Sequence, residues 1–185
     1  MNVEKKSQGK SIDVKKLVFV AVLTALVVVL QFFPVKFGTF ELALSVPVIV
    51  VGAALFGLGA GTWLGLVFGF VVLMLPGTVS FLTFSPFGTI VTVLLKGVLA
   101  GFCSALIYKP AARINKYFAC LVAAVVATFT NTLVFLIGSL IFFESNISVI
   151  INTFISINFL IELAVNVVFV PTIYRIIEIG KKKIR

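Results

Sequence analysis

Long apolar runs separated by short polar links dominate the pattern of hydrophobic and polar positions along this chain. A helix that crosses the roughly 30 Å hydrocarbon core of a bilayer needs about 20 mostly apolar residues. The runs that approach or exceed this length predict six transmembrane helices, at 17–33, 42–58, 61–75, 88–108, 117–143 and 153–177. We therefore expect an all-α integral membrane protein whose six-helix bundle occupies residues 17–179, between basic tails at 1–16 and 180–185.

The amino-acid composition supports this class of protein and excludes two others. Hydrophobic residues make up 61% of the 185 residues, charged residues make up 11%, and the mean hydropathy is +1.26. A soluble domain averages roughly 45–50% apolar and about 25% charged residues, so this chain lacks the polar surface that a soluble fold needs. A disordered chain is excluded as well, because disorder requires low hydrophobicity.

The formal net charge of +9 bears on the orientation of the helices in the membrane. Such a charge can indicate a nucleic-acid partner. However, thirteen of the fifteen Lys and Arg residues fall in the N-terminal tail, in the link at 109–116 and near the C-terminus, which six helices place on one side. Short loops rich in Lys and Arg face the cytoplasm. We therefore expect cytoplasmic termini, attraction to anionic membrane lipid and no nucleic-acid partner.

Residues suited to hydrolytic or metal chemistry are missing or scattered. The chain has no His that could activate a Ser or Cys nucleophile. Cys103 and Cys120 fall on different predicted helices, and we expect packing thiols rather than a disulfide or metal ligands. No phosphate-binding loop is present either. The sequence thus predicts a protein that is not an enzyme, has no ATPase activity of its own, and carries no cofactor or metal.

Small residues recur at helical spacing on several predicted helices. Ala21 and Ala25 form a flat stripe on the first helix, against which another helix could pack closely. Glycines recur every fourth residue from 57 to 69, and again at 97 and 101. The simpler interpretation of these glycines is close packing within the bundle, and a surface that slides against a partner is the alternative.

Polar side chains interrupt the last three predicted helices at similar depths. Lys96 lies about nine residues, or roughly 14 Å, below the outer end of its helix. Asn131 lies slightly deeper on the next helix, and Asn158, Glu162 and Asn166 share one face of the last. Such residues are costly within a membrane and commonly functional. Two interpretations stay open: a Lys96–Glu162 ion pair that only locks helices together, or the wall of a polar-ligand pocket opened from outside.

The two long outer links are rich in phenylalanine. They contribute Phe32, Phe33, Phe37, Phe40, Phe81, Phe84 and Phe87. These rings could form a lid over the pocket, with Phe40 and Phe84 as candidate ligand contacts. An interfacial aromatic belt is the alternative, although belts favour Trp and Tyr. Apolar walls, aromatic faces and a few convergent polar groups are typical of small-molecule sites.

Together these features resemble the substrate-binding S components of energy-coupling factor (ECF) vitamin transporters. The resemblance is carried by six helices with both ends inside and by a combination of motifs along nearly the whole chain. These motifs are Ala21 with Ala25, the glycine-rich stretch 52–65, residues 85–89 with Lys96 and Gly97, and residues 158–162 through Pro171.

The resemblance implies a multi-pass protein of the bacterial plasma membrane that binds a vitamin or related micronutrient from outside. It also implies docking on a transmembrane coupling protein with two cytoplasmic ATPases, through Ala21 and Ala25. The implied substrate contacts are Lys96, Asn131, Asn158, Glu162, Phe40 and Phe84. Lys96 suits the carboxylate of pantothenate, while riboflavin, folate and cobalamin stay open. Thiamin is disfavoured, because thiamin-binding relatives are rich in pocket Trp and Tyr and this chain has one Trp.

Two other classes of function stay open on the sequence. One is a stand-alone secondary transporter or channel for a small polar solute, a class that often shows repeated halves, of which we find no convincing trace. The other is a non-catalytic membrane scaffold, in which Lys96 and Glu162 would affect stability alone.

Overall fold

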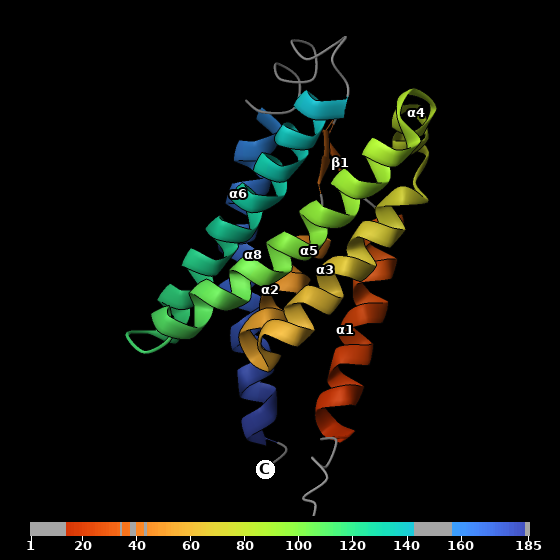
Figure 1. The fold of residues 1–185 in the computed structure, drawn as a ribbon. Coiled ribbons are helices and arrows are strands. Elements are labelled where there is room, and N and C mark those ends of the chain that lie inside the picture. Colours follow the sequence, from red (N-terminus) through yellow and green to blue (C-terminus); the bar gives the residue numbers. More distant parts are fainter. Residues whose placement is uncertain (1–13, 34, 38–39, 43, 143–156, 184–185) are drawn as a thin grey trace, which may run out of the picture.

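The computed structural model describes residues 14–33, 35–37, 40–42, 44–142 and 157–183. These residues form a helical bundle with one small hairpin (Figure 1). Its elements are α1 (Val14–Phe32), β1 (Val35–Phe37), β2 (Phe40–Leu42), α2 (Ser45–Phe56), α3 (Leu58–Leu73), α4 (Pro76–Phe84), α5 (Pro86–Ala111), α6 (Lys116–Phe142) and α8 (Ile157–Lys183). The helical membrane class expected from the hydrophobic pattern is thus the class that the structure shows.

The short helix α2 lies at the centre of the bundle. It packs against α1, α3, α5, α6 and α8, and every residue from Ser45 to Ala53 is buried. Its 12 residues extend about 18 Å at 1.5 Å per residue, well short of a bilayer core of roughly 30 Å. Consequently α2 fills one part of the bundle interior and leaves the rest to side chains of the surrounding helices.

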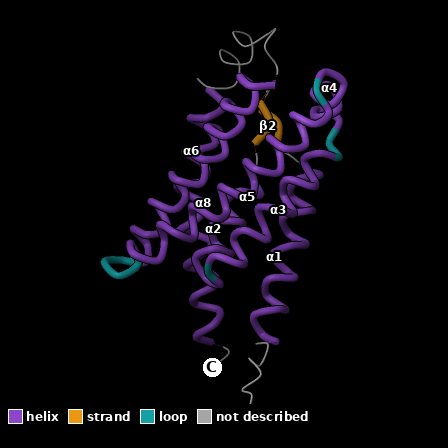
Figure 2. Tube along the Cα trace, in the orientation of Figure 1, coloured by secondary structure: helices purple, strands orange, loops and turns teal. Residues whose placement is uncertain are grey.

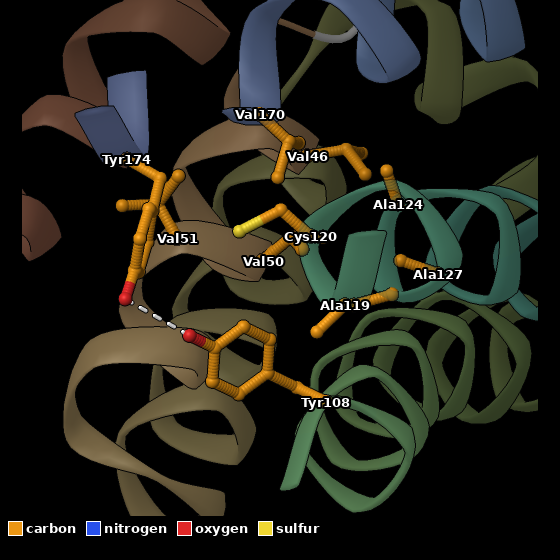
Figure 3. Packing of buried hydrophobic residues seen from close by; sticks show 11 residues of the cluster. Val46, Val50, Val51, Tyr108, Ala119, Cys120, Ala124, Ala127, Val170 and Tyr174 are labelled. Carbon is orange, nitrogen blue, oxygen red and sulfur yellow. Dashed lines mark hydrogen bonds between the residues drawn. The ribbon is translucent and has the colours of Figure 1, made fainter. Parts of the chain in front are cut away.

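Two apolar clusters meet on α2. Val46, Val50 and Val51 pack with residues of α5, α6 and α8, including the tyrosine pair shown in Figure 3. Val48 and Ile49 pack instead with residues of α1, α3 and α5. In a membrane, dispersion and close fit rather than removal of apolar surface from water supply the packing energy of these side chains. The central helix therefore joins the two halves of the bundle.

The glycine repeat brings α3 and α5 into backbone contact. A Cβ added at Gly65 would meet the carbonyl oxygen of Gly97, and one added at Gly97 would meet the carbonyl oxygen of Gly65. Gly61 and Gly101 are related in the same way one turn away. Small residues permit such close approach in membrane helices. The interpretation of the glycines as packing residues within the bundle is thus confirmed for these four. It is wrong for Gly57, which separates α2 from α3 with a φ of 83° and has nothing within 4 Å of an added Cβ.

Four described helices are long and apolar enough to cross a membrane: α1, α5, α6 and the Phe159–Ile179 part of α8. A fifth crossing results if α3 and α4, which are bent by 74° relative to each other, count as one span. The expected number of six spans is therefore not confirmed. The start of α1 and the end of α8 lie at the same end of the bundle, the lower end in Figure 1, which we call the terminal end.

Two links expected to be irregular contain regular structure. In the first link, strands β1 and β2 pair antiparallel, with Val35 opposite Leu42, and lie beyond α2 at the end away from the termini (Figure 2). The second outer link contains α4, which begins at Pro76 because the fixed φ of proline suits the first helical position.

The end of α5 also differs from the predicted helix. The predicted helix ends at residue 108, but α5 continues through Pro110 to Ala111. The missing N–H of Pro110 removes one bond, while the Ala112 N–H still donates to the Tyr108 carbonyl at 2.9 Å. One lost hydrogen bond is therefore tolerated in the last turn.

Candidate functional site

A buried hydrogen bond fixes the alignment of α6 and α8. Asn166 Nδ2 of α8 donates to Thr128 Oγ1 of α6 at 2.7 Å, and both side chains are fully buried. On the terminal side of this bond, the next turns carry Ala124 and Val170, which belong to the apolar cluster around α2. The bond therefore marks the limit of the apolar cluster that α6 and α8 form with α2.

Polar residues occupy the next turn on the other side of this bond. Asn131 lies three residues from Thr128 on α6, and Glu162 lies four residues from Asn166 on α8. Because the two helices run in opposite directions, these offsets place Asn131 and Glu162 at a similar level, about 4.5–6 Å beyond the bond at 1.5 Å per residue. Polar side chains of α6 and α8 thus begin about one turn beyond the bond.

The orientation of the Asn166 amide follows from its partner. The Thr128 hydroxyl donates to the Ala124 carbonyl at 3.0 Å, so its oxygen is left as an acceptor for a donor. The amide nitrogen of Asn166 must therefore face Thr128. The other end of the amide, Asn166 Oδ1, is buried and has no hydrogen-bond partner among the described residues.

Lys96 lies between two aromatic rings at this level. Its Nζ is 5.8 Å from the ring centroid of Phe68 on α3 and 5.1 Å from that of Phe135 on α6. The quadrupole of each ring attracts the ammonium group. Phe81 of α4 packs edge-on against Phe135, with ring centroids 6.1 Å apart. Helices α3, α4 and α6 therefore surround the Lys96 head group with aromatic carbon.

Lys96 and Glu162 interact electrostatically without a direct contact. Each charge acts on the other, yet no ion pair within 4.0 Å joins them in the described part of the chain. The Glu162 Oε1 atom is buried and has no hydrogen-bond partner among the described residues. The two groups therefore interact through their charges without a direct bond between them among the described residues.

Two hydroxyl groups that sequence reasoning did not single out are also buried without partners among the described residues. Thr92 of α5 and Ser139 of α6 are 3% and 2% exposed, and neither hydroxyl oxygen has a partner among the residues described. Gly138 lies against Thr92, since a Cβ at position 138 would overlap the threonine side chain. Ser and Thr side chains in helices commonly hydrogen-bond to their own helix backbone. The sequence therefore does not reveal that the hydroxyl groups of these two residues are unpartnered.

The sequence-predicted contacts fall into three groups. Lys96, Asn131 and Glu162 come together at one level, with Asn131 Oδ1 also buried and unpartnered in this part of the structure. The side chains of Asn158 and Phe40 lie outside the described residues. Phe84 is 77% exposed at the end of α4, and the ring of that helix that reaches the Lys96 cage is Phe81, one turn earlier.

The proposed docking residues lie on an open face. Ala21 and Ala25 of α1 are exposed, and among the described elements α1 packs against α2 and α3. Between the two alanines, the Thr24 Oγ1 atom accepts a hydrogen bond from Trp63 Nε1 of α3 at 3.2 Å. The single tryptophan of the chain is thus committed to the α1–α3 contact rather than to the polar site.

These features define an integral membrane protein with a buried polar site between its long helices and an exposed small-residue face on its first helix. The family model of the ECF transporter substrate-specific component matches residues 15–174. The chain therefore belongs to this family and is a substrate-specific subunit of a membrane transporter, as the sequence resemblance predicted. No curated protein and no solved structure matches the chain.

Proposed function

We propose that the polar residues on α5, α6 and α8 bind a vitamin or related micronutrient that enters from outside the cell. The observation that carries this proposal is a set of buried oxygen atoms without partners among the described residues, next to a caged ammonium group. The atoms are Thr92 Oγ1, Asn131 Oδ1, Ser139 Oγ, Glu162 Oε1 and Asn166 Oδ1.

The energetic cost of leaving these oxygen atoms without hydrogen-bond partners supports the binding of a ligand. Leaving a buried donor or acceptor unsatisfied costs about 1–3 kcal/mol, and this cost recurs at several positions of one region. A bound molecule that presents hydroxyl or amide hydrogens to these oxygens would recover that free energy on binding. A bundle stabilised only for scaffolding would gain more from apolar residues of similar volume.

Lys96 favours a ligand that also carries an anionic group. Its ammonium group touches aromatic faces and has no direct carboxylate partner among the described residues, so a ligand carboxylate could take that place. Pantothenate combines a carboxylate with hydroxyl and amide hydrogens and is our first candidate. Riboflavin, folate and cobalamin are the further candidates. The position of Trp63 beside Thr24 adds to the case against thiamin.

We further propose that the exposed alanine face of α1 docks on a transmembrane coupling protein, which two cytoplasmic ATPases drive. The positive tails and the shared end of the two termini support a cytoplasmic orientation of the terminal end. Transport energy then comes from the partner subunits, and this chain supplies substrate recognition.

Equilibrium binding to the purified chain tests the proposed substrate class. Isothermal titration in detergent, with pantothenate, riboflavin, folate and cobalamin tested in turn, is expected to give saturable binding of one compound at one site per chain. Absence of binding by all four compounds would contradict the substrate class that we propose. Transport by the chain alone, driven by an ion gradient in liposomes, would contradict the role of a docked recognition subunit.

A further inference from the structure

A concave surface lies far from the polar site. It is a groove of about 390 Å³ between the first turn of α6 and the latter part of α8, lined by Tyr117, Pro171, Thr172 and Arg175. Arg175 lies nine residues beyond Asn166 on α8, or about 13.5 Å along the helix at 1.5 Å per residue. The groove is therefore separate from the site proposed for the transported substrate, and its interpretation rests on the proposed function only for the cytoplasmic orientation of the terminal end.

Tyrosine contacts hold one wall of the groove in place. The Tyr108 hydroxyl donates to the Tyr174 hydroxyl at 3.0 Å, inside the cluster drawn in Figure 3. The Tyr117 ring packs edge-on against Tyr174, with centroids 6.3 Å apart and ring planes at 87°. Tyr117 remains 43% exposed, so its other face is available at the surface of the groove.

The charges around the groove leave one cation uncompensated. Glu178 lies one turn from Arg175, but its carboxylate binds Lys116 Nζ at 3.2 Å. Arg175 is exposed and has no recorded polar partner within the described residues. The described charges at the end of α5 and in the α5–α6 link, Lys109 and Arg113, are also basic. The groove thus presents a free guanidinium group in a positive environment.

The position and chemistry of the groove indicate what occupies it. Arg175 lies within the last turn of the apolar part of α8, which ends at Ile179, and Lys116 begins α6. Tyr and Arg at the ends of membrane helices lie at the level of lipid head groups. A guanidinium group binds phosphate through two parallel hydrogen bonds, and the ring of Pro171 offers an apolar wall for the glycerol and upper acyl chain.

We infer that this groove binds the phosphate head group of an anionic phospholipid, held by Arg175 and flanked by the Tyr117 ring. Basic pockets between membrane helices at the cytoplasmic side are typical places for such head groups. Charge complementarity and the position of the groove at the end of the apolar part of α8 support a lipid over a soluble solute. A site-bound lipid would lie against the junction of α6 and α8 and would stabilise their contact.

Native mass spectrometry of the full chain tests this inference, with phosphatidylglycerol and phosphatidylcholine as probes. We expect one phosphatidylglycerol to be retained by the wild type, with retention reduced about fivefold in Arg175→Gln, as one lost basic contact predicts. The matched control is Arg113→Gln, which removes the same charge from an exposed position outside the groove and should retain the lipid.

Three outcomes would overturn the inference. Equal losses of phosphatidylglycerol in Arg175→Gln and Arg113→Gln would indicate diffuse electrostatic attraction. Retention of phosphatidylcholine to the same extent as phosphatidylglycerol would exclude an anion site. Displacement of the lipid by inorganic phosphate at matched concentration would indicate a site for free anions. If Arg175→Gln does not fold, Arg175→Lys decides, because it keeps the charge but loses the two-point contact. A clear loss of phosphatidylglycerol in that variant supports the lipid site, and unchanged retention overturns it.

Discussion

Asn166 carries two hydrogen-bonding groups into the apolar interior, and the described part of the protein satisfies one of them. Its amide nitrogen is bound by Thr128, whose own proton is committed to a backbone carbonyl. Its amide oxygen is buried without a partner among the described residues. Asn166 therefore serves two purposes: its bonded amide nitrogen aligns α6 with α8, and its amide oxygen is left as an acceptor for a ligand.

Replacing Thr128 by Val tests the contribution of its hydrogen bond with Asn166. The valine is similar in volume but cannot accept from Asn166 Nδ2, which then remains buried and unsatisfied. We expect the free energy of unfolding to fall by about 1–3 kcal/mol, measured by thermal unfolding in detergent. Thr132→Val is the control, because Thr132 lies on the same helix and no side-chain hydrogen bond is recorded for it in the described part. Equal effects of the two substitutions would contradict the importance of the bond.

At the scale of elements, the contact between α3 and α5 depends on the absence of side chains. The carbonyl oxygens of Gly65 and Gly97 occupy the space that a Cβ on the opposite glycine would need. Backbone atoms cannot move aside as a flexible side chain can. The same contact positions Phe68 and Lys96 on adjacent helices, so the ammonium cage depends on helix packing one turn away.

Gly65→Ala is therefore expected to separate α3 from α5. Overpacking of this kind costs about 1–3 kcal/mol, and we expect a lower midpoint of thermal unfolding together with weaker ligand binding. Gly59→Ala on the same helix is the matched control, since nothing lies within 4 Å of a Cβ at that position. Alanine is a better helix former than glycine by about 1 kcal/mol, so the control should be as stable as the wild type or more stable.

The sequence predicted some elements closely and could not predict others. The limits of α6 differ from the expected helix by one residue at each end, because a long apolar run there begins after a charged link. The start of α2 was missed, since Leu42 and Leu44 are as apolar as the helix itself and hydropathy does not distinguish a strand end from a helix. The helix α4 was missed because Pro, Gly, Ser and Thr are typical of loops.

The residues of the candidate site were likewise predicted only in part. The shared level of Lys96, Asn131 and Glu162 followed from helix periodicity, because depth along a regular helix can be counted. The choice of Phe68 and Phe135 as the rings beside Lys96 could not be predicted among 20 phenylalanines. That choice depends on how the helices cross, which no local pattern of the sequence encodes.

At the scale of the whole molecule, α1 differs from the other long helices. Among the described elements it packs against α2 and α3 alone, and much of its surface is apolar and exposed, including Val18, Val22 and Val29. Lipid can cover such a face. A closely approaching partner helix would use the small side chains of Ala21 and Ala25.

Arginine at both alanines tests the docking role. The Ala21→Arg, Ala25→Arg double variant is expected to lose co-purification with the coupling protein and ATPases while ligand binding by the isolated chain is kept. Arginine at Val125 is the control, because this residue is also exposed and lies at a similar distance from the terminal end of its own helix. Loss of ligand binding in the double variant, or equal loss of assembly in the control, would contradict docking through α1.

The central claim is that the buried polar residues around Lys96 hold the transported molecule. Mass spectrometry of the small molecule released by denaturing the purified chain tests it most directly. We predict one vitamin-like compound per wild-type chain, retained by Lys109→Met and reduced about tenfold to a hundredfold in Lys96→Met, as loss of a charged hydrogen bond implies. Lys109 is the matched control because it is an exposed lysine of the same helix. Retention of the same compound to the same extent by Lys96→Met and Lys109→Met would contradict the claim.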